Sequence, residues 1–194
     1  MKQSHHAFHT LIVCLGLVAF SASGHATAFA GSYAVDPVHS TVLFRIKHMG
    51  TSYAWGRFNE IAGRLNLDDQ APSLEMQVKT ESLDTANAKR DQHLRSPDFF
   101  SAKQFPAISF KSTRVARVGD NKYDVDGTLS LHGVDRPLKV QLERTGTGKN
   151  QLGAAVAGYT TTFSIKRSDF GMKFGLEGLS DDVLLIVSLE CAAQ

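Results

Sequence analysis

Polar and apolar residues alternate along most of this chain of 194 residues, and the alternation limits its fold more than any other feature. In residues 40–48, for example, Val42, Phe44 and Ile46 alternate with two basic residues. Successive side chains of a β-strand point to opposite faces, so this pattern predicts strands with one buried face. The same pattern recurs in residues 61–67, 74–79, 108–113, 123–131, 138–142, 156–167 and 183–190.

The connections between most of these segments are short, which favours antiparallel pairing. We predict an all-β fold in which about eight antiparallel strands close into a barrel, because closure removes exposed strand edges. A barrel of this size is either filled by its own side chains or holds one ligand. Small residues such as Gly63 and Gly127 among the apolar positions favour an interior with room for a long apolar ligand, and a self-filled module for protein contacts is the alternative.

One segment after residue 30, at about residues 86–100, has the character of a helical insertion. Thr85 or Asn87 can cap its start, and several good helix formers follow. Ser96 and Pro97 then predict a second short helix, because proline is well tolerated at the first helical position.

Residues 1–30 are organised like a secretory signal peptide. Lys2 and an apolar core from Leu11 to Phe20 precede two small-residue cleavage patterns, which end at Ala28 and Ala30. The apolar core is shorter than the ~20 residues that a transmembrane helix needs. We therefore expect one exported domain, residues 31–194, that does not span a membrane.

Removal of the signal peptide takes one of the 21 basic residues, Lys2, and leaves 20 against 19 acidic residues. This near balance argues against nucleic acid as a partner. Cys191 remains as the single cysteine, so an intrachain disulfide is excluded and a disulfide-linked homodimer stays open.

The sequence predicts no metal site and no cofactor. The four histidines after residue 30 (His39, His48, His93 and His132) lack the spacing of a metal-binding motif. We also find no serine nucleophile motif and no prominent carboxylate pair, so we expect a binding protein and not an enzyme. An enzyme that uses Asp91 or His93 on an apolar substrate inside the barrel is the alternative.

Arg90 and His93 share one face of the predicted helix, where they can converge on an anionic or carbonyl group of a ligand. Alternatively, Arg90 or Asp91 holds the helix against the barrel. Arg167 falls on the apolar side of its strand and therefore needs a partner, which Asp91, Asp169 or a ligand phosphate can supply.

Two further histidines have both a structural and a ligand-binding interpretation. His48 lies on the apolar face of its strand, as a core residue or a ligand contact, and His39 lies in a turn, with a head-group contact as the alternative. The candidate ligand-binding residues are His39, Phe44, His48, Arg90, His93, Phe110, Tyr159, Phe163 and Arg167.

A series of short motifs resembles the YceI-like family over nearly the whole of residues 31–194. The motifs are Tyr33-x-Val35-Asp36-Pro37-x-His39-Ser40, Phe44-x-Ile46-x-His48-x-Gly50, Gly56-x-Phe58, Lys89-Arg90-Asp91-x-His93-Leu94, Phe99-Phe100, Phe105-Pro106, Gly127-x-Leu129-x-Leu131-x-Gly133-Val134 and Arg167-x-Asp169-Phe170-Gly171. The resemblance implies a lipocalin-like barrel in the periplasm of Gram-negative bacteria. It also implies a binding or carrier role for a polyisoprenoid lipid, such as a polyprenyl phosphate or an isoprenoid quinone. It supplies no catalytic residue.

Overall fold

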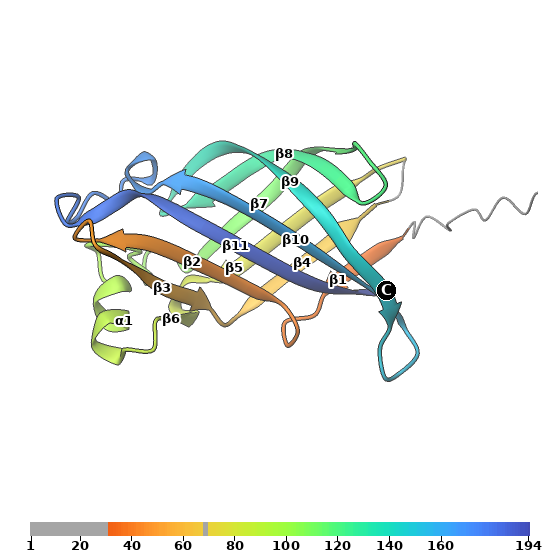
Figure 1. Ribbon diagram of the computed structural model, residues 1–194, viewed down its shortest axis with the longest axis horizontal. Helices are drawn as coiled ribbons and strands as arrows, with labels where there is room; N and C mark the ends of the chain where they lie inside the picture. The colour runs from red at the N-terminus through yellow and green to blue at the C-terminus, as the bar shows by residue number, and fades with distance from the viewer. Residues whose placement is uncertain (1–30, 68–69) are drawn as a thin grey trace, which may run out of the picture.

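Eight antiparallel strands close into a ring in the computed structural model, which describes residues 31–67 and 70–194 (Figure 1). In ring order they are β1 (Ser32–Val35), β4 (Ile61–Asn66), β5 (Ser73–Lys79), β7 (Ala107–Arg117), β8 (Lys122–Leu131), β9 (Val134–Lys149), β10 (Ala155–Lys166) and β11 (Leu179–Ala193). The ring closes where β1 pairs with β11, with Val35 opposite Cys191. This confirms the predicted barrel. The signal peptide predicted at residues 1–30 lies outside the described residues.

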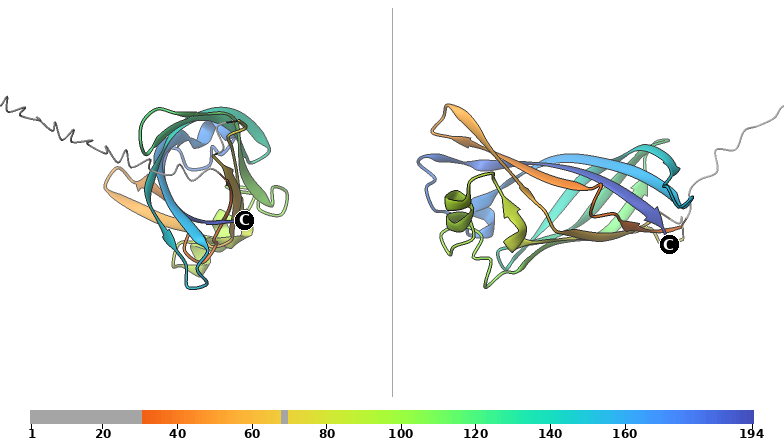
Figure 2. Two further views of the ribbon diagram at one scale, coloured as in Figure 1. Left: turned by 90° about the vertical axis from the view of Figure 1, so that its right-hand side faces the viewer. Right: turned by 90° about the horizontal axis from the view of Figure 1, so that it is seen from below.

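Strand β11 is long enough to pair with two different neighbours on one side. Its last residues pair with β1, and residues 179–188 pair with β2 (Thr41–His48). The sheet then continues through β3 (Ser52–Phe58) to the short strand β6 (Leu83–Asp84). The view along the barrel in Figure 2 shows the ring and the hairpin of β2 and β3 beside it.

The sequence analysis did not predict strands β1 and β3. β1 has only four residues, and the inward positions of β3 include Ala54 and Gly56, which do not read as an apolar face. Gly56 is required because a Cβ there would lie 2.2 Å from Cζ of Phe44 on the paired strand β2.

Short turns connect β8 to β9 and β9 to β10. The turn between β8 and β9 consists of His132 and Gly133 alone, both with positive φ, so Pro137 lies within β9. The next turn follows Lys149, and in it the amide of Gly153 donates to the carbonyl of Asn150.

The helical insertion begins as expected. Asn87 caps α1 (Ala88–Leu94) by accepting a hydrogen bond from the amide of Arg90, 3.0 Å away. The segment that Ser96 and Pro97 begin is a series of hydrogen-bonded turns and not a second helix. Two short 3₁₀ helices, η1 (Thr80–Ser82) and η2 (Arg167–Phe170), complete the described elements. Within the described residues, no helix has the length and apolarity to cross a membrane.

The half of the barrel that contains the C-terminus is filled by its own side chains. Tyr33, Leu65, Val125, Leu142, Tyr159 and Cys191 meet there with almost no exposed surface. Helix α1, η2 and the loops that precede β3 and β11 all lie at the opposite end (Figure 1).

Candidate functional site

A cavity of about 860 Å³ occupies the half of the barrel near α1. Its volume lies within the range of about 300–1,000 Å³ that ligand pockets usually have. The wall is built from the inward faces of strands, and its apolar residues include Phe44, Met76, Phe110, Leu138, Phe163 and Val187. The cavity can therefore shelter an apolar chain from water.

The filled half of the barrel forms the floor of this cavity. Tyr159 is fully buried and lies outside the lining, and burial raises the pKa of its phenol. Thr161, two residues along the same face of β10, does line the cavity. Neither the hydroxyl of Tyr159 nor that of Thr161 has a hydrogen-bond partner among the described residues.

At the mouth, Arg90 and Asp91 both bind the same residue, Thr85. Oδ1 of Asp91 accepts hydrogen bonds from the amide and the hydroxyl of Thr85, at 2.8 and 2.5 Å. Nε and Nη2 of Arg90 donate to the hydroxyl and the carbonyl of Thr85, at 2.7 and 2.6 Å. These bonds hold α1 against Thr85, which directly follows β6. This agrees with the interpretation that Arg90 or Asp91 holds the helix against the barrel. Arg90 also lines the cavity.

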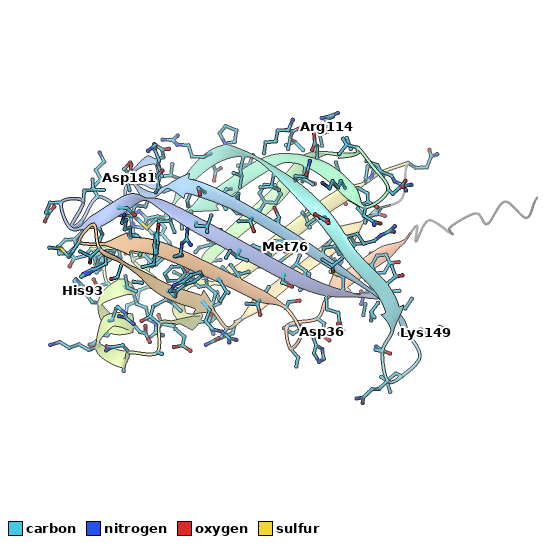
Figure 3. The ribbon with its side chains drawn as sticks, viewed as in Figure 1. Asp36, Met76, His93, Arg114, Lys149 and Asp181 are labelled. Carbon is cyan, nitrogen blue, oxygen red and sulfur yellow. The ribbon has the colours of Figure 1, made fainter. Side chains whose placement is uncertain are left out.

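His93 joins α1 to the loop of residues 171–178. Its Nε2 lies 2.9 Å from Oδ2 of Asp98, and its ring packs edge-on against Phe99 and Phe174, with centroids 5.1 and 5.4 Å apart. Figure 3 shows His93 at the α1 end of the barrel, far from Lys149, with Met76 between them. His93 is therefore part of the mouth.

Arg167 is almost completely buried, and its partners are backbone carbonyls. It donates to the carbonyls of Ser180, Met172, Phe174 and Leu179 at 2.8 to 3.1 Å. Its charge thus fixes the path of the loop before β11. None of the hydrogen bonds of Arg167 within the described residues goes to Asp91 or Asp169, the carboxylates that the sequence analysis considered.

Seven of the nine predicted ligand-binding residues line the cavity: Phe44, His48, Arg90, His93, Phe110, Phe163 and Arg167. His48 is exposed at the mouth and is not a core residue. Tyr159 and His39 lie outside the lining. Contact of any of the nine with a ligand remains a prediction.

His39 lies in the exposed turn between β1 and β2. Its Nδ1 is 2.9 Å from Oδ2 of Asp36 and 3.7 Å from Oε1 of Glu190. The hydrogen bond with Asp36 raises the pKa of His39 and lowers that of Asp36. Each of these three residues has an atom that could bind a metal ion, and the three atoms lie within 4.8 Å of one another. The hydrogen bond between Asp36 and His39 is enough to explain why they lie so close.

The sequence analysis missed the residues that the two loops and β3 bring to the mouth, which are Met49, Tyr53, Trp55, Met172 and Phe174. The alternating aromatic residues Tyr53 and Trp55 were the available signal. The sequence of the loop of residues 171–178 gave no signal that it belongs to the site, because its glycines indicate only a connection between two elements.

Comparisons with known proteins agree with this architecture. The family model of the YceI-like domain matches residues 33–191. A UPF0312 protein of Pseudomonas aeruginosa is 37% identical over 187 residues, which cover 94% of this chain and 96% of that protein. The crystal structure of a Campylobacter jejuni YceI protein matches with a TM-score of 0.68 at 30% identity, over 77% of this chain and 90% of that one. A polyisoprenoid binding domain from Saccharophagus degradans, implicated in plant cell wall breakdown, shares the fold, with a TM-score of 0.68 at 19% identity over 84% of this chain and 98% of that one.

Proposed function

Because the chain belongs to the YceI-like domain family, we propose that it is an exported periplasmic protein that binds and carries a polyisoprenoid lipid inside its barrel. The observation that carries the proposal is the apolar cavity, which is closed by a filled floor at one end and edged by α1 and two loops at the other. The polyisoprenoid binding domain of the same fold supports the ligand class. The predicted signal peptide supports the location.

Burial of the isoprenoid tail supplies most of the affinity in this proposal. Removing apolar surface from water is worth roughly 25 cal/mol per Å², and the cavity wall is mainly aliphatic and aromatic. The role is binding and not catalysis. Asp91, one of the two residues considered for catalysis, accepts two hydrogen bonds from Thr85 and does not line the cavity.

The head of the lipid, a phosphate or a quinone ring, lies at the mouth in this proposal. Two nitrogens of Arg90 bind Thr85, and the third, Nη1, has no hydrogen-bond partner among the described residues. Arg90→Ala should therefore weaken binding of a polyprenyl phosphate more than binding of the matching polyprenol, because a phosphate gains more from the guanidinium. Equal losses for the two lipids would show that Arg90 acts only through Thr85.

A substitution that narrows the cavity tests whether the lipid binds there. Phe163 lines the cavity, whereas Ser164, the next residue on β10, is exposed on the outer face. In Phe163→Trp the larger ring should reduce uptake of a long-chain isoprenoid quinone, measured by lipid extraction after incubation. Ser164→Trp adds a larger side chain outside the barrel and should leave uptake at the wild-type level. Equal uptake by both variants would place the lipid elsewhere.

A further inference from the structure

Exposed large apolar side chains gather at the mouth of the cavity. The eight such side chains among the described residues include Met49, Tyr53, Trp55, Phe174 and Leu176, which are 40% to 63% exposed and belong to the β2–β3 hairpin and the loop before β11. The other three are Val38, Val118 and Leu152, which lie in three separate turns away from the mouth. We call the first five the mouth rim.

The two segments of the mouth rim form one surface. The amide of Met49 donates a hydrogen bond of 2.6 Å to the carbonyl of Gly178, so the hairpin tip touches the loop. Figure 1 shows both segments at the α1 end of the barrel. Contiguous exposed apolar surface on a protein usually marks an interaction site.

The surface of the mouth rim continues into the cavity. Met49, Tyr53, Trp55 and Phe174 are exposed to solvent and also line the cavity, whereas Leu176 lies only on the outside. A partner that covers the mouth rim therefore also meets the entrance through which a ligand passes.

Unpaired cations surround the mouth rim. The guanidinium of Arg45 lies 4.1 Å from the ring centroid of Tyr53 and 5.5 Å from that of Trp55. Among the described residues, Arg45, Lys47 and Lys173 have no carboxylate within 4.0 Å, and Glu177 is the only acidic residue in 45–55 and 171–178. On the outer faces of β5 and β7, by contrast, Lys79, Lys111 and Arg114 have carboxylate partners at 2.9 to 3.1 Å.

From these observations we propose that the mouth rim docks on the surface of a lipid bilayer that contains anionic phospholipids. Tryptophan and tyrosine favour the boundary between hydrocarbon and head groups, and unpaired cations beside them match the negative charge of that surface. The inference rests on the proposed function, because an isoprenoid tail that passes from a bilayer through the mouth rim into the cavity avoids exposure to water.

The single tryptophan of the chain, Trp55, allows a test with the unaltered protein. Vesicles of phosphatidylethanolamine and phosphatidylglycerol, without isoprenoid, should shift Trp55 emission to shorter wavelength and should sediment the protein. Both effects should weaken at high salt and with vesicles of phosphatidylcholine alone, because screening or loss of the anionic head groups removes the electrostatic attraction. An unchanged emission together with protein that stays in the supernatant would overturn the proposal and direct attention to a protein partner.

A combined variant separates docking from lipid binding. Leu176→Ser, Lys47→Gln and Lys173→Gln change exposed residues that do not line the cavity. Together they should weaken vesicle binding by about tenfold or more, with isoprenoid uptake from solution unchanged. Leu152→Ser, which removes a still more exposed apolar side chain away from the mouth, should bind vesicles like the wild type.

The two proposals fail in different ways. A wild-type protein that takes up isoprenoid but ignores vesicles contradicts docking alone. A protein that takes up no isoprenoid contradicts the proposed function, whatever the vesicles show. Equal loss of vesicle binding in the combined variant and in Leu152→Ser would also overturn the role of the mouth rim.

Discussion

Arg167 illustrates, at the scale of single residues, a buried charge that organises backbone. Parity along β10 predicted that its side chain points inward, and it does. Its partners could not be predicted, because they are carbonyls of the following loop and of the first two residues of β11, and the path of that loop depends on the bonds to Arg167 itself. Sequence patterns give the face on which a side chain lies, but they do not give the conformation of an irregular loop.

Arg167→Met should destabilise the protein by about 3 kcal/mol, because several carbonyls around a buried site lose their donor at once. The neighbouring Lys166 is exposed, with Nζ 3.3 Å from Oδ1 of Asp182, and Lys166→Met should cost less than about 1 kcal/mol. The measurement is the free energy of unfolding from urea titration of both variants. Similar losses in the two variants would contradict a structural role for the buried guanidinium.

The turn at His39 gives a prediction about pH. The hydrogen bond with Asp36 raises the pKa of His39 above the roughly 6.5 of an unfolded chain. A raised folded-state pKa adds stability that is complete below the unfolded pKa and is lost as pH rises through the folded pKa. NMR titration of the His39 ring should show the raised value, and Asp36→Asn should lower it. A pKa for His39 that Asp36→Asn leaves unchanged would contradict the contact.

The burial of Cys191 determines whether its thiol can form a disulfide with a second chain. The sequence analysis left open a disulfide between two chains, but the thiol is fully buried and burial raises its pKa to about 12. The fold therefore does not present this thiol to a second chain. A homodimer that forms through other contacts remains an untested prediction.

At the scale of elements, glycines beside aromatic residues shape the barrel wall. The sequence analysis took Gly63 and Gly127 as signs of free space. In the structure, a Cβ on Gly127 would lie 2.4 Å from Cζ of Phe110 and 2.6 Å from the carbonyl oxygen of Lys111, and a Cβ on Gly63 would lie 2.4 Å from the sulfur of Met76. The glycines do not line the cavity themselves but leave room for the side chains of Met76 and Phe110, which do.

Gly127→Ala should therefore cost about 1–3 kcal/mol of stability, because the carbonyl of Lys111 belongs to the paired strand and cannot easily move. Gly146→Ala is a matched control, since a Cβ there meets nothing within 4 Å. That variant should change the free energy of unfolding by less than about 0.5 kcal/mol. Thermal or urea unfolding of the two variants gives the comparison, and equal stability would contradict the tight packing at Gly127.

The elements that the sequence predicted well are those with long, regular alternation, such as β8 and β10. Strand β3 was missed because two of its inward residues, Ala54 and Gly56, are small, and the ring of Phe44 fits over Gly56. The segment after Ser96 was predicted as a helix from its first residues, but its amides bond to scattered carbonyls and form turns. Local preference alone does not determine such a segment.

At the scale of the whole molecule, the barrel is divided into a filled half and a hollow half. Alternation predicted closure into a ring, and seven of the nine predicted ligand-binding residues line one cavity. The division itself was not predictable, because tyrosine and leucine occur in both halves and only their three-dimensional packing decides where space remains. Hence Tyr159, predicted in the ligand site, lies in the filled half.

The most direct test of the proposed function is to identify what the protein holds in the cell. The protein would be purified without detergent from a periplasmic fraction, extracted with organic solvent and analysed by mass spectrometry. We predict a polyprenyl phosphate or an isoprenoid quinone at about one molecule per chain, because the proposed ligand site is the single interior of one barrel, where the cavity of about 860 Å³ lies. A protein that carries no isoprenoid, and that also takes up none when quinones and polyprenyl phosphates are supplied, would contradict the account.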